Sequence, residues 1–185
     1  MQNHENISKL IDDYGSSILH LAYSFVRNRQ TAEDLSQEIF IKCFEKLDSF
    51  KGESNIQTWL YRIAINHCKD YLRSWHYRKV QVSEYASTLF SKNEVGPEDL
   101  YLKKINNTEL INDIFKLPVK YREIIILYYF HEISLKEIAE INSINLNTAK
   151  SRMTRAKEIL KRHIQERSNT YGQSNKRSER SITKG

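Results

Sequence analysis

Residues that interrupt regular structure are rare in this chain: its 185 residues include five glycines and two prolines. β-sandwiches, β-barrels and phosphate-binding folds all depend on frequent tight turns or glycine-rich loops. The scarcity of both residues argues against these folds and favours long helices with short joints. Hydrophobic residues make up 39% of the chain, which is enough to build cores. We therefore predict an all-α protein of one or two small domains.

Apolar residues in the first half of the chain repeat at helical spacing. The pattern predicts helices over residues 7–27, 32–47 and 58–79, with a polar loop at 48–57 between the last two. Thr31 is the expected N-cap of the second helix, because Asp34 follows it at the spacing of a capping box. These helices make up a first domain, residues 1–79.

The second half begins after a stretch without periodicity. Residues 80–96 are interpreted as a flexible linker, and residues 97–167 as a second helical domain. Within it we expect a helix over 97–115, a joint at Leu117-Pro118 and a buried helix over 121–130. Residues 168–185 carry almost no apolar side chains, so the interpretation is a disordered basic tail.

Residues 134–164 have the pattern of a helix-turn-helix. A short helix over 134–141 is followed by a tight turn at 142–145 and a second helix from Leu146, and the small Ala139 would let the two helices approach closely. One face of the second helix offers hydrogen-bonding groups for base edges and cations for phosphates, while a plain helical hairpin is the alternative. The residues of that face are Asn147, Lys150, Ser151, Thr154 and Arg155.

Positive charge is concentrated in two blocks. Residues 58–79 carry five basic and one acidic side chain, net +4, and residues 146–185 carry eleven and three, net +8. Residues 1–57 and 80–145 are each net −3. This alternation predicts two separate contacts with a polyanion.

The third helix carries one of these blocks as a single ridge. Its members recur three or four residues apart, and Trp59 flanks them: Arg62, Asn66, Lys69, Arg73 and Tyr77. Cations interleaved with aromatic rings suit single-stranded nucleic acid, because charges meet phosphates while rings stack on bases. An ordinary solvated face is the alternative interpretation.

Motifs for catalysis or metal binding are missing from the sequence. Two cysteines, Cys43 and Cys68, are too few for a disulfide framework or a four-cysteine zinc site. His131-Glu132 is not a zinc-protease motif, because Leu135 stands where the second histidine is needed. The polar N-terminus does not resemble a secretion signal, and no apolar run is long enough to cross a bilayer. We expect a cytoplasmic protein without enzymatic activity or cofactors.

Motifs in both halves resemble one family, the extracytoplasmic-function (ECF, group IV) sigma factors of bacterial RNA polymerase. The resemblance covers residues 8–79 and 98–165. It is carried by residues 32–40 (AEDLSQEIF), 58–66 (TWLYRIAIN), 134–141 (SLKEIAEI) and 148–152 (TAKSR). It implies that residues 1–79 are sigma region 2, which binds polymerase and opens the −10 element. It also implies that residues 97–167 are sigma region 4, which reads the −35 element.

The resemblance also implies partners and site residues. The partners are core RNA polymerase, promoter DNA (duplex at −35, single-stranded at −10) and an anti-sigma factor, which in many relatives is membrane-anchored. The polymerase-binding set is Asp34, Gln37, Glu38, Ile41 and Glu45. The −10 set is Ser54, Asn55, Trp59, Arg62, Asn66, Lys69, Arg73 and Tyr77. The −35 set is Asn147, Thr148, Lys150, Ser151, Thr154 and Arg155.

The sequence departs from the family in the turn of the helix-turn-helix. Ser143 stands where the family usually has glycine, and asparagines at 145 and 147 replace a Pro-x-Gly entry. We expect the turn to persist, because asparagine tolerates left-handed backbone and caps helices well.

Two other functions fit parts of the pattern. A helix-turn-helix repressor or activator would leave the basic ridge of the third helix without a role. A protein that imitates a sigma factor in order to bind an anti-sigma factor would not need two basic faces.

Overall fold

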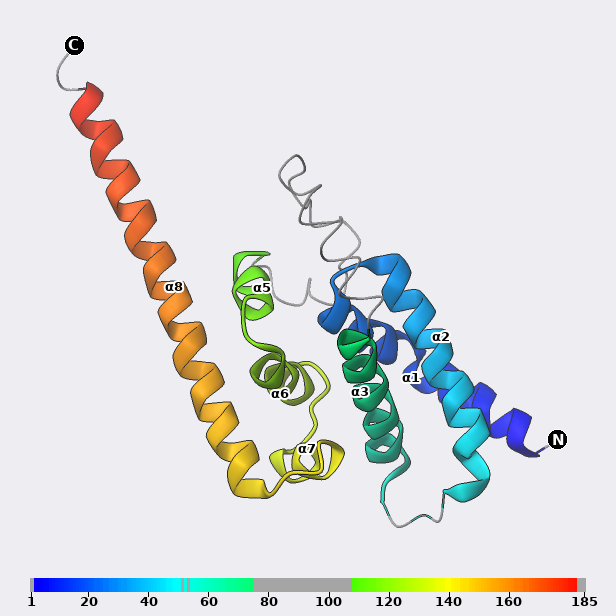
Figure 1. The fold of residues 1–185 in the computed structure, drawn as a ribbon. Coiled ribbons are helices and arrows are strands. Elements are labelled where there is room, and N and C mark those ends of the chain that lie inside the picture. The colour runs from blue at the N-terminus through cyan, green and yellow to red at the C-terminus, as the bar shows by residue number, and fades with distance from the viewer. Residues whose placement is uncertain (1, 51, 53, 75–107, 183–185) are drawn as a thin grey trace.

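The computed structural model describes residues 2–50, 52, 54–74 and 108–182, and these residues form helices joined by short turns, with no strand among them (Figure 1). The all-α prediction is confirmed. The expected linker at 80–96, the helix start at 97 and Tyr77 lie outside the described residues. Within the described part, none of the helices combines the length and the apolar character that crossing a membrane requires.

Three helices form the first domain: α1 (Gln2–Val26), α2 (Arg29–Lys46) and α3 (Ile56–Arg73), with a short 3-10 turn η1 (Leu47–Ser49) after α2. Each helix turns an apolar stripe inward, which excludes water from a common core. Fully buried members of this core are Ile18, Leu21, Leu35, Ile39, Leu60 and Ala64. The three helices predicted from periodicity are confirmed here, although Ile11 on the apolar stripe of α1 is exposed.

The start of α2 differs from the prediction. Asn28, not Thr31, is the N-cap: its backbone is extended, and its Oδ1 accepts a hydrogen bond from the Thr31 amide at 2.9 Å. The physical reason lies one residue earlier, where Arg27 takes a left-handed φ of 56° and ends α1. The chain therefore turns before Asn28, and asparagine is among the strongest N-caps.

The second domain contains α5 (Thr108–Phe115), α6 (Val119–Tyr129), α7 (Leu135–Ile141) and α8 (Leu146–Ile182). The predicted joint at Leu117-Pro118 is confirmed, and α6 begins directly after Pro118. Ser134 caps α7 in a capping box with Glu137, in which each side chain bonds the other residue's backbone amide. This box fixes where α7 starts and therefore how it meets α8.

The helix α8 is longer than predicted. It spans 37 residues to Ile182, so the segment 168–182, expected to be disordered, is helical, and its end projects beyond the rest of the molecule (Figure 1). Apolar content alone misjudged this segment. The docked first half of α8 provides the nucleus, and each further residue then adds a hydrogen bond without a new nucleation cost. Arg167 anchors the extension to α5 through ion pairs with Glu109 and Asp113.

The two domains pack directly against each other. Helix α3 contacts α7, and α1 contacts α6, so α3 lies between α1 and α2 on one side and the second domain on the other (Figure 1). The Tyr61 hydroxyl and His131 Nδ1 are 2.8 Å apart across this interface, and both residues are buried. Nearby, the rings of Tyr23 and Phe115 meet edge to face with centroids 5.9 Å apart.

Candidate nucleic-acid interface

The turn between α7 and α8 sets the direction of the second helix. Ser143 takes the left-handed conformation, with φ of 53°, and Asn145 Oδ1 accepts from the Thr148 amide at 2.7 Å at the start of α8. The predicted turn therefore persists without glycine. The left-handed residue is Ser143 itself, and an asparagine supplies the helix cap, as its side chain favours.

The predicted −35 face of α8 lies in solvent. Every member is exposed except Thr148, which is partly buried, whereas Ala149, Met153 and Ala156 on the opposite side are buried. Thr154 donates its hydroxyl hydrogen to the Lys150 carbonyl at 3.2 Å. Such a hydroxyl keeps its lone pairs free to accept from a base or a bridging water. The Arg155 guanidinium lies 2.9 Å from a carboxylate oxygen of Glu158. This ion pair is exposed and therefore weak, so a DNA phosphate can take the place of Glu158.

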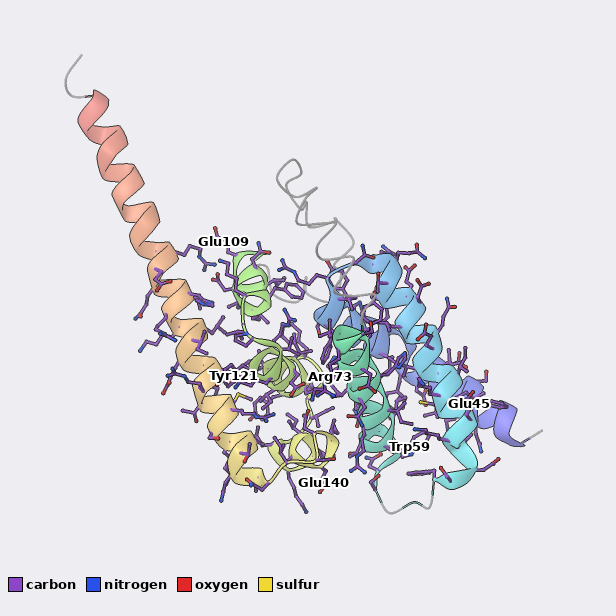
Figure 2. The ribbon with its side chains drawn as sticks, in the orientation of Figure 1. Glu45, Trp59, Arg73, Glu109, Tyr121 and Glu140 are labelled. Carbon is purple, nitrogen blue, oxygen red and sulfur yellow. The ribbon has the colours of Figure 1, made fainter. Side chains whose placement is uncertain are left out.

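The predicted −10 ridge follows α3 from Trp59 near its start to Arg73 at its end (Figure 2). Trp59 is partly buried against Phe50, with ring centroids 5.2 Å apart, while Asn66 and Arg73 are exposed. Arg62 is partly buried, and among the described residues its Nε has no hydrogen-bond partner. The partly exposed indole of Trp59 can stack a base on its open side.

Lys69, in the middle of this ridge, does not project freely into solvent. Its Nζ lies 2.9 Å from Glu123 Oε2 on α6 and donates to Asn142 Oδ1 at 2.6 Å. The side chain of Glu123 is completely buried, and Arg152 of α8 lies 3.8 Å from its other oxygen. The structure therefore brings most of the ridge to the surface but places its central cation in the domain interface.

Sequence reasoning missed the face of α3 that meets the second domain. Tyr61 is 1% exposed and Ile65 is fully buried, although the predictions for this helix concerned only its basic ridge. A signal was present in the spacing, because Tyr61, Ile65 and Lys69 recur every four residues and form a second stripe on the helix. A surface helix has one apolar stripe, so a second stripe indicates a second packing partner.

The short loop before α3 provides the helix cap. Asn55 is exposed, and its Oδ1 accepts from the Gln57 amide at 3.0 Å, which begins α3 at Ile56, two residues earlier than predicted. Ser54 is partly buried beside it. The amide group of Asn55 keeps its donor hydrogens for another partner, so capping and base capture are compatible.

The five residues predicted to bind polymerase are all exposed on α2. Ile41, with 58% of its surface exposed, borders a hollow of about 610 Å³ between α1 and α2. Apolar side chains line most of this hollow: Ile7, Ile11, Phe40, Ile41 and Phe44. An exposed apolar patch with polar residues at its edge is typical of a protein-binding surface. Glu38 also contacts His67 Nε2 at 2.7 Å and so connects this surface to α3.

Neither cysteine is placed for metal binding or redox chemistry. Cys43 and Cys68 are buried thiols, and burial raises the pKa of each to about 12. Thiolates are the reactive and metal-binding form, so both residues act as small core side chains. Among the described residues, no three histidine, cysteine or acidic side chains come together in a metal-binding arrangement.

Comparisons with known proteins agree with this geometry. The family model of sigma-70 region 2 matches residues 10–77, and that of sigma-70 region 4 matches residues 114–160. The chain is 35% identical to the ECF RNA polymerase sigma factor SigW of Bacillus subtilis over 85% of this chain and 88% of that protein. It is 34% identical to the ECF RNA polymerase sigma-E factor of Escherichia coli K12, covering 71% and 73% of the two chains. The solved structure of the sigma factor RpoE of Bartonella quintana, in complex with the anti-sigma factor NepR, matches with a TM-score of 0.67 at 26% identity, covering 87% of this chain and 98% of that one.

Proposed function

Because the chain belongs to the ECF group of the sigma-70 family, we propose that its residues divide the work of promoter recognition between α2, α3 and α8. The protein is an alternative sigma factor: it binds core RNA polymerase, recognises −35 and −10 elements and helps to open the DNA. The observation that carries the assignment of residues is the exposed face at the start of α8, held by the Ser143 turn and the Asn145 cap.

In this proposal α8 enters the major groove at the −35 element. Asn147, Ser151 and Thr154 supply hydrogen-bonding groups for base edges, and Lys150 and Arg155 reach phosphates or guanines. All five are exposed on one face, and the buried opposite face keeps the helix rigid. Base contacts then give specificity, while phosphate contacts fix the register.

The −10 element is opened along α3. Trp59 offers a stacking surface, Asn55 and Ser54 bind a flipped base, and Arg62, Asn66, Lys69 and Arg73 follow the single strand. Extruding a base costs a few kcal/mol, which stacking and hydrogen bonds in the protein offset. Polymerase holds both domains on one promoter, so each weak reader works at high effective concentration. The protein itself performs no covalent step in this scheme.

Polymerase binds α2 through its exposed acids and the apolar hollow beside Ile41. This activity places the protein in the cytoplasm with its polymerase. An anti-sigma factor is the proposed regulator: the structurally similar RpoE was crystallised with the anti-sigma factor NepR. Such a partner would hold the protein inactive, and where it is membrane-anchored it would do so at the inner face of the membrane.

The test is run-off transcription with bacterial core RNA polymerase on a genomic fragment library, with and without this protein, at moderate salt. Discrete new transcripts that share spaced −35 and −10 elements are the expected result. Core binding without transcripts would favour a sigma mimic. Binding to duplex DNA by the protein alone, without core binding, would favour a repressor.

A further inference from the structure

One buried carboxylate lies between the two proposed DNA-facing helices. The oxygens of Glu123 on α6 face Lys69 of α3 at 2.9 Å and Arg152 of α8 at 3.8 Å. Lys69 also binds Asn142, in the turn that leads into α8. A cation from each helix is therefore directed toward a single internal anion.

The ion pair between Lys69 and Glu123 can be broken by separating the two domains. Neither oxygen of Glu123 accepts a hydrogen bond within the described residues, although the side chain is fully buried. Because Glu123 accepts no hydrogen bond there, its ion pairs with Lys69 and Arg152 alone offset the hydration that it lost, and the pair with Lys69 exists only while the domains are packed. Separation of α3 from the second domain would return Lys69 and one edge of Glu123 to water. The pair is thus suited to reversible release.

Two other contacts across the interface position the domains but involve no carboxylate. Tyr61 bonds His131, and the Arg27 guanidinium lies 4.9 Å from the centre of the Phe115 ring. The Tyr61–His131 contact holds α3 against the second domain in the register that aligns Lys69 with Glu123.

We propose that Glu123 stands in for a DNA phosphate and holds the free protein in a closed state in which Lys69 is neutralised until the two domains separate. This inference rests on the proposed function, because it takes α3 as a DNA-binding helix. A lysine already paired with an internal carboxylate does not displace counterions from DNA, so the closed state binds nucleic acid less well. Any partner that contacts the two domains only when they are apart selects the open state.

The first test measures the closed state directly. The full chain receives cysteines at the exposed positions Gln30 on α2 and Lys136 on α7, labelled with a donor and an acceptor dye; the buried Cys43 and Cys68 stay unlabelled because burial raises their thiol pKa to about 12. Single-molecule energy transfer then gives the ratio of open to closed molecules. Glu123→Gln leaves Lys69 in the interface without its counter-charge and should therefore raise that ratio about tenfold.

A matched control is available on α7. Glu140→Gln makes the same change of net charge at an exposed residue of the second domain (Figure 2) and should leave the ratio as in the unchanged chain. Because Glu123→Gln alters a buried site, Lys69→Met breaks the same pair from its partly exposed side and should also open the chain. A free chain that is already open, or an opening by Glu123→Gln no greater than by Glu140→Gln, would overturn the proposal.

The second test measures nucleic-acid binding by the free chain. A fluorescein-labelled single-stranded oligothymidylate is titrated with each variant between 50 and 200 mM salt. Glu123→Gln should bind about tenfold more tightly at low salt, with a salt slope steeper by about 0.7, the value for one more phosphate contact on a single strand. Adding Lys69→Met to Glu123→Gln should remove this gain. Unchanged affinity in Glu123→Gln would contradict the stand-in role.

Run-off transcription separates the two levels of inference. If the unchanged chain gives no transcripts with core polymerase, the proposed function fails, whatever the energy-transfer result. If it gives transcripts but Glu123→Gln neither opens the chain nor tightens binding, only the closed-state inference fails.

Discussion

Mild acid should destabilise this protein through one buried histidine. His131 follows α6 at the domain interface, with 9% of its surface exposed and Nδ1 2.8 Å from the Tyr61 hydroxyl. Burial, together with the nearby charge of His20, lowers the pKa of His131 from 6.5 to about 4. At pH 5 the folded chain therefore keeps this imidazole neutral, while the unfolded chain protonates it.

The direction and size of the effect follow from proton linkage. Between pH 6.5 and pH 4 the unfolded chain binds more protons than the folded chain, so the free energy of unfolding falls as the pH falls. With these two pKa values, lowering the pH from 7 to 5 removes about 2 kcal/mol of stability. Below the folded pKa of His131 both the folded and the unfolded chain are protonated at this group, so it causes no further loss of stability. A contribution of this size is a large part of the stability of a small protein.

Urea unfolding followed by tryptophan fluorescence at pH 7 and pH 5 measures the effect. His131→Gln offers Tyr61 another acceptor but cannot titrate, so it should lose about 2 kcal/mol of the pH dependence. Tyr61→Phe is the matched control: it removes the hydrogen bond yet leaves the histidine buried. It should keep the pH dependence and lose about 1–3 kcal/mol at both pH values. An undiminished pH dependence in His131→Gln would refute the reasoning.

Three further predictions concern the proposed surfaces. Arg155→Ala should lower run-off transcription from a cognate promoter by about tenfold without weakening core binding, because one base or phosphate contact is worth about 1–3 kcal/mol. Equal loss of transcription and core binding would argue against a DNA-binding role for Arg155. Ile41→Glu should reduce core binding in a pull-down by at least about tenfold, since it places a charge in an apolar contact. Helicity measured by circular dichroism should stay unchanged because Ile41 is exposed. Normal core binding by this variant would argue against α2 as the polymerase-binding helix. Asn55→Ala should lower the free energy of urea unfolding by about 1 kcal/mol, because the hydrogen bond to the Gln57 amide is lost. Asn55→Ser can still cap the helix and should recover most of this stability. No loss of stability in Asn55→Ala would show that the Asn55 cap does not stabilise α3.

Local features of the fold could be predicted well from the sequence. Helix identity, the Leu117-Pro118 joint and the turn before α8 depend on neighbours within a few residues, so spacing and capping chemistry were sufficient. Errors at this level were also local. Thr31 was chosen over Asn28 as the cap because the left-handed Arg27 that precedes it leaves no pattern in the sequence.

The exposed faces of α2 and α8 were also accessible from the sequence. Each helix has a single apolar stripe, so the opposite side is solvent-facing whatever covers the stripe. Residues such as Ile41 on α2 and Lys150 on α8 are exposed where the spacing placed them. What they bind remains a prediction that rests on the family.

The sequence by itself determined which residues form helices and which faces are polar, because these properties are set by neighbours three or four positions apart. Only the tertiary structure decided what covers α3. The Tyr61–His131 and Lys69–Asn142 contacts join residues 70 and 73 positions apart, and periodicity does not say which distant element meets a stripe. A lysine at a given position of a helix can extend its flexible side chain into solvent or toward an internal anion, and the helical spacing of the sequence is the same in both cases. Here the docked second domain provides Glu123 as the partner of Lys69.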